Sequence, residues 1–291
     1  MFMRSGSVGI PSSCEKMVNL TSDSMLGHRV QPSPVAAGPS SRKSLCGSRP
    51  PLQTLDIEFG EEPSTPPIKD LSAGKTMQAG QWCERNSVAL LEACCNRDVD
   101  RAVRILEQAS LEQVGKERMA KIVLLKDDFR DTALHLSACH GEVGIVKLLL
   151  ARGADVRAEN NLGSTPLNIA AVAGKNEVIE LLLDAGANLE HQDDISGTPL
   201  HGAARRNHCA TVRLLLNRGA LVDAADGVGN RPLHLAAAEG GISALQVLMQ
   251  HYADPQVKNM RGQTPLDVAQ ASWISKFAKE KIARLLSAES T

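Results

Sequence analysis

The sequence predicts an all-α repeat solenoid that follows a disordered N-terminal arm. The first observation is a period of 33 residues that separates five leucines, namely Leu134, Leu167, Leu200, Leu233 and Leu266. A fixed period of this length indicates stacked structural repeats. The second is composition, because the chain is 43% hydrophobic but only 2% aromatic, and small side chains suit closely stacked helices. The third is that the N-terminal part shows neither helical nor strand periodicity.

Residues 1–83 are predicted to be a disordered arm rich in serine and proline. Nine of the fourteen prolines lie in this part of the chain. Such a segment cannot bury enough apolar area to offset its ordering entropy. Leu55–Phe59 alternates apolar and acidic residues, which fits either a short docking motif or a solvated stretch. Ser33 and Thr65 precede prolines and are candidate phosphorylation sites.

Residues 84–126 are predicted to form an N-terminal capping helix pair with an insertion. Asn86 and Ser87 are candidate N-cap residues of its first helix. The stretch between Leu106 and Asp127 is about ten residues longer than its counterpart in the next unit and includes an apolar run. We expect an elongated finger there, whose apolar run packs against the first repeat.

Five units with the same predicted parts follow. Units 1 to 5 span residues 127–159, 160–192, 193–225, 226–258 and 259–291. A threonine caps the first helix, and a proline takes the first helical position, where its missing N–H has no intrahelical partner to lose. A glycine ends the second helix, because a left-handed residue is expected there. A hairpin rich in Asp and Asn leads to the next unit, and the last unit is expected to act as a C-terminal cap.

Over roughly residues 84–291 these units resemble the ankyrin repeat. The resemblance rests on blocks such as Thr198-Pro199-Leu200-His201-Gly202-Ala203-Ala204 and Gly153-Ala154-Asp155. It implies a β-turn and two antiparallel helices in each unit. It also implies a binding module and not an enzyme. The histidines at repeat spacing, His135, His201 and His234, are then expected to make structural hydrogen bonds rather than to hold a metal.

Three departures from that pattern carry structural expectations. Asn207 replaces a turn glycine, which is tolerated because Asn adopts positive φ more readily than most residues. Tyr252 replaces the glycine after a second helix, so we expect a distorted turn there. Arg231 replaces a capping threonine and removes a cap worth about 1 kcal/mol, so unit 4 is expected to be among the softer units.

The candidate partner-binding residues stand where the repeat pattern leaves positions free, in the hairpins, before the capping threonine and at the end of the first helix. By family resemblance these positions line the concave face. They are Phe129, Asp131, His140, Leu162, Ile195, Arg205, Arg206, Asn230, Glu239 and Arg261. The hairpins also present an apolar row, which suits a protein or peptide surface: Phe129, Leu162, Ile195, Val228 and Met260. The alternative is that the aliphatic members of the row pack against neighbouring hairpins.

Other chemistry has little support in the sequence. We predict no catalytic residue, no metal site and no cofactor. Cys94, Cys95 and Cys139 could pair with His140 as nucleophiles, but no third group is present to orient such a pair. A net charge of −1 gives no field toward nucleic acid, and no apolar run reaches the roughly 18 residues of a membrane span. We therefore expect no nucleic acid, membrane or small-molecule substrate as a partner. Seven cysteines without a CxxC motif indicate a reducing compartment, the cytoplasm or the nucleus.

The sequence therefore predicts a non-enzymatic protein–protein interaction module, an adaptor or scaffold that binds a partner protein on its concave surface. The alternative function is a regulatory inhibitor or targeting subunit of an enzyme or transcription factor. In both cases the residues that differ between units are expected to select the partner, because the residues that repeat form the frame.

Overall fold

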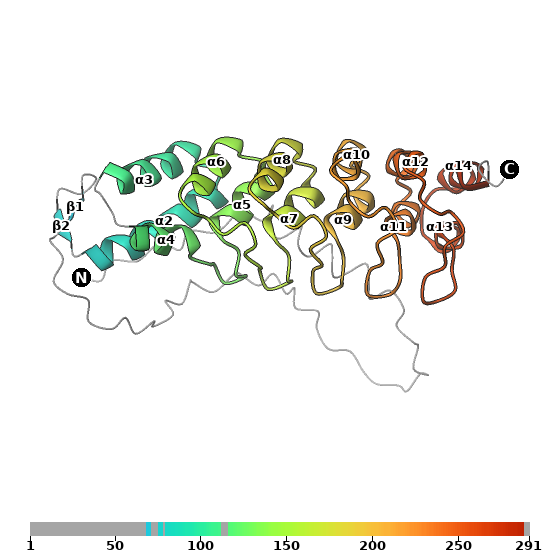
Figure 1. Ribbon diagram of the computed structural model, residues 1–291, viewed down its shortest axis with the longest axis horizontal. Coiled ribbons are helices and arrows are strands. Elements are labelled where there is room, and N and C mark those ends of the chain that lie inside the picture. The colour runs from blue at the N-terminus through green and yellow to red at the C-terminus, as the bar shows by residue number, and fades with distance from the viewer. Residues whose placement is uncertain (1–67, 71–74, 78, 112–115, 288–291) are drawn as a thin grey trace, which may run out of the picture. The chain divides into compact units, whose positions relative to one another are not determined.

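The computed structural model describes residues 68–70, 75–77, 79–111 and 116–287, and this part of the chain is mainly helical (Figure 1). It begins with two short strands, β1 (Ile68–Asp70) and β2 (Lys75–Met77), which pair antiparallel. Residues 1–67 lie outside the described residues, and with them lies most of the predicted arm, including its candidate docking and phosphorylation motifs. The C-terminal end of the predicted arm, by contrast, contains these strands and the start of a helix.

The first long helix, α2 (Ala79–Cys95), begins well before the predicted N-cap. Asn86 and Ser87 lie inside it, and their side chains donate to backbone oxygens one turn earlier, at 2.8 Å from Trp82 O and 2.7 Å from Cys83 O. The N-cap prediction is therefore wrong, and the predicted boundary between residues 83 and 84 falls inside α2. Trp82 is almost fully buried and anchors this part of the helix in the core.

The described part of the insertion, from Lys116 onward, forms a helix rather than an elongated finger. After α3 (Val99–Leu111), the chain enters α4 (Lys116–Leu124), which packs against α2. Ile122 and Val123 are buried, whereas Leu124 is exposed. The expectation that the apolar run packs was therefore right, and the helix that contains it contacts α2 of the N-terminal helix pair.

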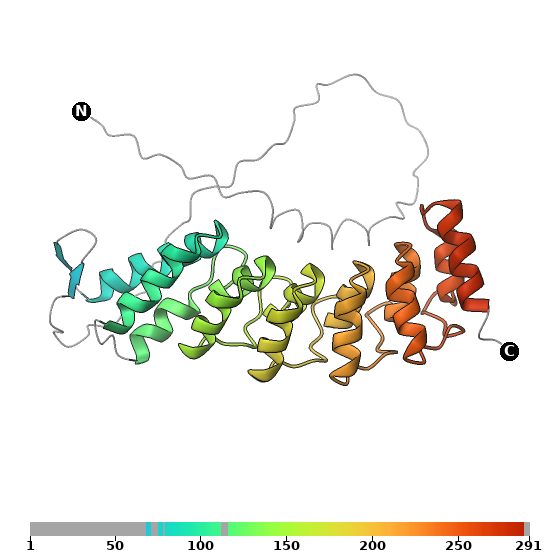
Figure 2. The ribbon, with the colours of Figure 1, turned by 90° about the horizontal axis from the view of Figure 1, so that it is seen from above.

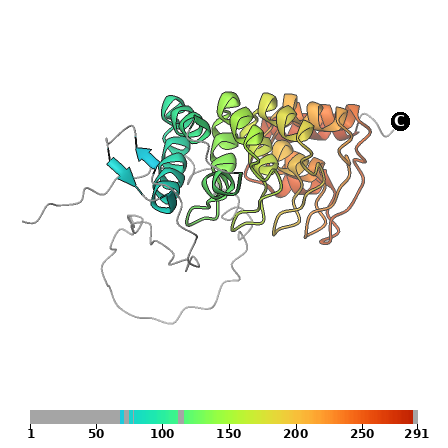
Figure 3. The same ribbon diagram turned by 60° about the vertical axis from the view of Figure 1, so that its left-hand side comes forward.

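The five units each contribute an inner helix followed by an outer helix. The inner helices are α5 (Ala133–His140), α7 (Pro166–Ala173), α9 (Pro199–Arg205), α11 (Pro232–Ala238) and α13 (Pro265–Ala271). The outer helices are α6 (Val143–Ala151), α8 (Asn176–Asp184), α10 (Cys209–Asn217), α12 (Ile242–Gln250) and α14 (Lys276–Ser287). Inner helices pack on inner helices and outer on outer, in sequence order (Figure 2). The hairpins that connect the units all leave the same side of the stack (Figure 3).

The core is a continuous layer of small and aliphatic side chains between the two rows of helices. The leucines that mark the period are almost fully buried in units 1 to 4, and Leu266 is partly buried in unit 5. Alanine pairs such as Ala170–Ala171 and Ala203–Ala204 are fully buried, and their small size lets neighbouring inner helices approach. Burial of these side chains against adjacent units is the main source of stability in a solenoid.

The turns show which departures from the repeat pattern the backbone tolerates. Asn207 adopts a φ of 57°, as expected for a residue that replaces a turn glycine. Tyr252 adopts a φ of 62° and keeps the hydrogen bonds of the turn, because its N–H donates to Met249 O at 3.0 Å and that of Ala253 donates to Leu248 O at 3.1 Å. The predicted distortion is therefore wrong. The tyrosine accepts the backbone strain, about 1–2 kcal/mol, with its side chain 93% exposed.

Candidate functional site

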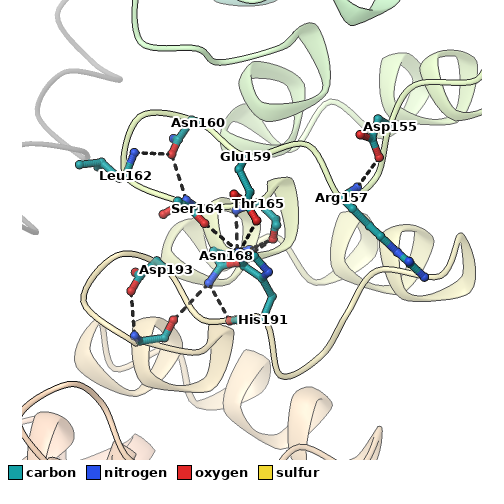
Figure 4. A network of polar contacts seen from close by, with 12 residues as sticks. Asp155, Arg157, Glu159, Asn160, Leu162, Ser164, Thr165, Asn168, His191 and Asp193 are labelled. Carbon is teal, nitrogen blue, oxygen red and sulfur yellow. Dashed lines mark hydrogen bonds and ion pairs between the residues drawn. The ribbon is translucent and has the colours of Figure 1, made fainter.

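The hairpins are held by an Asp or Asn at the same position in each unit. The five residues are Asp127, Asn160, Asp193, Asp226 and Asn259. In each, one side-chain oxygen accepts from two backbone N–H groups on the far side of the turn. For Asn160 these distances are 2.9 Å to Leu162 N and 3.0 Å to Ser164 N (Figure 4). The turn is thereby fixed around the residue at its tip.

Asp193 illustrates the electrostatics of this position. Its Oδ1 accepts from Ile195 N at 3.2 Å and from Gly197 N at 2.7 Å. Burial raises the pKa of the Asp193 carboxyl, while the two backbone hydrogen bonds act in the opposite direction. An Asn oxygen accepts the same two hydrogen bonds in units 2 and 5, so the position requires an acceptor and not a charge.

Neighbouring hairpins are joined by a ladder of backbone hydrogen bonds. The carbonyl oxygen of each tip residue accepts from an N–H in the next hairpin, as in Asn161 N to Phe129 O at 2.9 Å and Gly227 N to Ile195 O at 3.0 Å. This ladder holds the hairpins in register. It exposes four tip side chains in successive units, which we call the apolar tip row: Phe129 (36% exposed), Leu162 (36%), Ile195 (43%) and Val228 (38%).

The predicted fifth member of that row, Met260, is out of register. Arg261 follows Val228 by 33 residues, and its N–H bonds to Asn259 Oδ1 as a tip residue does. Met260 instead supplies the ladder N–H, which donates to Val228 O at 3.1 Å. The apolar tip row therefore ends at unit 4, and the exposed Arg261 continues it with a cation.

The repeated histidines link each unit to the next. The N–H of Thr132 donates to His135 Nδ1 at 3.2 Å, so Nδ1 is the acceptor and Nε2 carries the proton. His135 Nε2 then donates to Ser164 O in unit 2, at 3.1 Å. His201 and His234 make the same bonds to the carbonyls of Asn230 and Gln263. Burial lowers the pKa of His135 to about 4 and lowers the pKa values of His201 and His234.

These bonds are the structural role that the family resemblance implies for the histidines. Among the residues that the structure describes, no group of three or more His, Cys, Asp or Glu side chains could hold a metal ion.

Units 2 and 5 replace the histidine, and each replacement fits its position in the stack. Asn168 accepts from Thr165 N at 3.3 Å through Oδ1 and donates to Gly197 O at 3.4 Å through Nδ2 (Figure 4). The Asn amide therefore makes the same two types of hydrogen bond as the histidine ring. Asp267 accepts from Thr264 N and Oγ1 at 2.9 and 2.8 Å, but a carboxylate has no proton to donate to a further unit.

Unit 4 lacks half of this arrangement. Arg231 N donates to His234 Nδ1 at 3.1 Å, but the guanidinium has no acceptor atom that could replace the threonine hydroxyl. In addition, among the described residues Arg231 Nε is buried without a hydrogen-bond partner, and so is Oδ1 of Asp223 at the end of unit 3. The lost cap is thus accompanied by two unsatisfied polar atoms, which are costly inside a protein.

Two of the predicted partner-binding residues are bonded between hairpins. Asp131 Oδ1 accepts from Asn160 Nδ2 at 2.9 Å, and Asn230 Oδ1 accepts from Asn259 Nδ2 at the same distance. Asn230 also donates to Asp226, through Nδ2, at 3.1 Å. Their polar atoms therefore support the hairpin frame.

The remaining predicted residues divide between the tips and the inner helices. Arg205 and Glu239 form an ion pair between units 3 and 4, with 3.5 Å from Nε to Oε1, and the Arg205 side chain is only 12% exposed. Arg206 and His140 are partly buried at the ends of their inner helices. The structure thus brings Arg205 and Glu239 together, while His140 and Arg261 stand in units far apart in the stack.

The nucleophile considered in the sequence has an unsuitable environment. Cys94 is fully buried, and burial raises the pKa of its thiol to about 11. At neutral pH this thiol is protonated, and a protonated thiol is a poor nucleophile.

Sequence reasoning identified the exposed tip residues but not the Asp and Asn residues that hold them. The signal was present, because Asp or Asn recurs every 33 residues at the position two before the tip.

No helix in the described part of the chain is both long and apolar enough to cross a membrane.

Comparison with known proteins follows from this architecture. A family model described as ankyrin repeats in three copies matches residues 90–193 and again residues 189–259. Together these matches cover more than half of the chain. A search of curated proteins found no match.

Proposed function

The chain belongs to the ankyrin repeat family, whose repeats are generally protein–protein interaction modules, and from this premise we propose that it is a non-enzymatic adaptor. In this proposal a partner protein binds the face formed by the apolar tip row and the exposed ends of the inner helices. The seven cysteines without a CxxC motif support a reducing location, the cytoplasm or nucleus.

The apolar tip row is the observation that carries this proposal. Four large apolar side chains stand exposed in successive units, each on a turn fixed by two side-chain and several backbone hydrogen bonds. A rigid surface loses little conformational entropy on binding, and removal of the exposed apolar area from water then favours association. The variation in size from Phe129 to Val228 gives the row a shape that a partner can match.

The charged residues beside the row favour a polar rim around this apolar centre. Arg205 and Glu239 neutralise one another, whereas Arg206 has no ion-pair partner in the described part of the chain. Arg is among the residue types that most often act as anchors in protein interfaces. A partner with an acidic group opposite Arg206 would satisfy this charge.

The frame also supports a function without catalysis. Both ring nitrogens of His135 are hydrogen-bonded, and Nε2 of His201 and of His234 donates to a backbone carbonyl of the next unit. Burial lowers the pKa of all three histidines. They are therefore held neutral as structural links and lack a free position for substrate.

Site-specific photocrosslinking tests the binding face. A photoreactive amino acid is placed at Leu162 or Ile195 in the full chain, and matched controls carry it at Glu180 or Arg213, which are exposed on the outer helices of the same two units. We expect one partner to crosslink from both tip positions in cells and not from the controls. Leu162→Glu should abolish the crosslink formed from Ile195. Equal crosslinking from the tip positions and from the control positions on the outer helices would contradict the proposal.

A further inference from the structure

The turn between α13 and α14 differs from the equivalent turns of the other units. Units 1 to 4 place a residue of positive φ there, between 57° and 81°: Gly141, Gly174, Asn207 and Gly240. The residue that follows in this 33-residue series is Trp273, and it is not among the described residues of positive φ. Instead, α13 ends at Ala271, and its C-cap residue Ser272 is extended, with a φ of −78° and a ψ of 156°.

The rebuilt turn shifts α14 by one residue relative to the earlier outer helices. Those helices begin at residues 143, 176, 209 and 242, whereas α14 begins at 276 rather than 275. Phe277 matches positions that are buried in units 1 to 4, yet it is 72% exposed. Ile282, one residue beyond the position matched by the buried Leu248, takes the core place and is fully buried.

Two aromatic side chains are exposed by this change. Trp273 is 106% exposed in the turn before α14, and Phe277, the second residue of α14, is 72% exposed. Their exposure contrasts with the other tryptophan, Trp82, which is almost fully buried. Scattered exposed apolar residues are ordinary on protein surfaces, but a Trp and a Phe only four residues apart in the chain offer the large apolar contact area of an interface anchor.

The helix that carries Phe277 and follows Trp273 is basic. Lys276, Lys279, Lys281 and Arg284 are opposed within α14 by Glu280 alone. None of these cations forms an ion pair with a residue in the described part of the chain, although Lys279 Nζ donates to Gln270 O at 2.7 Å. Lys281 and Arg284 follow Phe277 by four and seven residues, so they share its face of α14, the last helix of the stack (Figure 2).

We propose that Trp273 and Phe277, together with Lys276, Lys281 and Arg284, form a second docking site that binds an acidic peptide segment of a partner protein. The aromatic pair receives an apolar anchor of that segment, and the cations attract its carboxylates. A protein segment fits better than an anionic membrane, because the whole chain has a net charge of −1 and Glu280 interrupts the basic surface. The site is distinct from the apolar tip row, which lies on the hairpins of units 1 to 4.

The local charge can be measured with the tryptophan itself. In the full chain, Trp82 is buried and Trp273 is exposed, so collisional quenching of fluorescence reports mainly on Trp273. Anionic iodide should quench this emission more strongly than cationic caesium at equal concentration and ionic strength. Lys276→Glu with Lys281→Glu should reverse that order, and Lys147→Glu with Arg213→Glu, on other outer helices, should not. Equal quenching by the two ions in the native chain would remove the basis for an acidic partner.

Binding is tested by selecting short random peptides on the full chain. We expect the selected peptides to be enriched in Asp and Glu beside an apolar residue. Trp273→Ala and Phe277→Ala should each lower the affinity for a labelled selected peptide by about tenfold or more, as expected for interface anchors. Leu162→Glu, in the apolar tip row, should leave its affinity unchanged, which separates this site from the proposed adaptor face.

Three outcomes would overturn the docking site: selected peptides without acidic enrichment, affinity that survives Trp273→Ala, or affinity lost in Leu162→Glu. Vesicles of phosphatidylserine and phosphatidylcholine serve as the second probe. Vesicle binding that depends on Trp273 would assign the surface to a membrane and would likewise overturn the proposal. Thermal unfolding of each variant, followed by circular dichroism, shows whether a lost affinity reflects loss of the fold.

Discussion

At the scale of the residue, a histidine in the first turn of an inner helix bonds to the N-cap residue and joins that helix to the next unit. His135 must accept at Nδ1 and donate at Nε2, which requires a neutral ring with its proton on Nε2. Asn168 meets the same requirement with its oxygen and its nitrogen. The histidine is therefore needed for its hydrogen bonds and not for its charge, and protonation of the ring removes the acceptor.

Acidification should destabilise the array through these histidines. The pKa of His135 is about 4 in the folded chain and about 6.5 in an unfolded one. Between these values the unfolded state binds more protons, so the stability present above pH 6.5 is lost as the pH falls toward 4. The full loss from His135 is on the order of 3 kcal/mol. His201 and His234, with lowered pKa values, act in the same direction.

Urea denaturation between pH 7.5 and pH 4.5 measures this loss. The matched variant carries His135→Asn, His201→Asn and His234→Asn, because unit 2 already uses Asn at this position. Its unfolding midpoint should depend less on pH than that of the native chain. A native midpoint that stays constant over this range, or equal slopes for both proteins, would contradict the prediction. His208, whose pKa burial also lowers, accounts for a residual slope.

At the scale of the element, the sequence predicted the parts that repeat and missed parts that occur once. The helices of units 1 to 5 were predicted because Thr, Pro, Leu and Gly recur at fixed positions. The start of α2 was missed because Asn86 and Ser87 look like caps, whereas their side chains bond one turn back inside the helix. The one-residue shift of α14 was missed because the 33-residue register assigns Phe277 to the core. The sequence indicates the shift only through Trp273, because a Trp at positive φ would be strained and the turn must therefore differ.

The same reasoning explains what could be predicted of the candidate site. The exposed tips were recognised from their variation, but the ladder that holds neighbouring hairpins in register is made of backbone atoms, which carry no sequence signal. Met260 was misplaced by one residue because it is apolar, although the Asp or Asn two residues before each tip fixes the register. The bonds of Asp131 and Asn230 between hairpins were not predicted, because they depend on which side chains the stacking brings together.

The hairpin should depend on the side chain of Asp193 and not on its charge. Asp193→Ala leaves the N–H groups of Ile195 and Gly197 without their acceptor, which should destabilise the array by about 1–3 kcal/mol. Asp193→Asn should retain most of the stability, since Asn160 and Asn259 serve in units 2 and 5. Chemical denaturation measures the difference, and Asp194→Ala, at the exposed neighbouring residue, is the control. An Asn variant as unstable as the Ala variant would show that the carboxylate charge matters.

At the scale of the whole molecule, each unit contacts only its neighbours, so a weak unit divides the stack. Unit 4 is that unit on the evidence of its polar atoms, because Arg231 supplies no hydroxyl and leaves Nε buried without a partner. Unit 5 depends on it, since Asp267 cannot donate to a further unit and α13 has an inner-helix neighbour on one side only. Opening of units 4 and 5 together is therefore expected to require less free energy than opening of units 1 to 3.

Arg231→Thr should close this weak point. The new hydroxyl can donate to His234 Nδ1 as Thr198 does to His201, and the buried, unpaired Nε of Arg231 is removed, so we expect a gain of about 1–2 kcal/mol. Hydrogen exchange followed by mass spectrometry should show slower exchange in peptides from α11 to α14 and unchanged exchange in those from α5 to α8. Arg213→Thr, at an exposed position of α10, is the control and should slow neither set. Uniform slowing over all units would mean that the array opens as one cooperative body, and native peptides from unit 4 that exchange more slowly than those of every other unit would contradict its weakness.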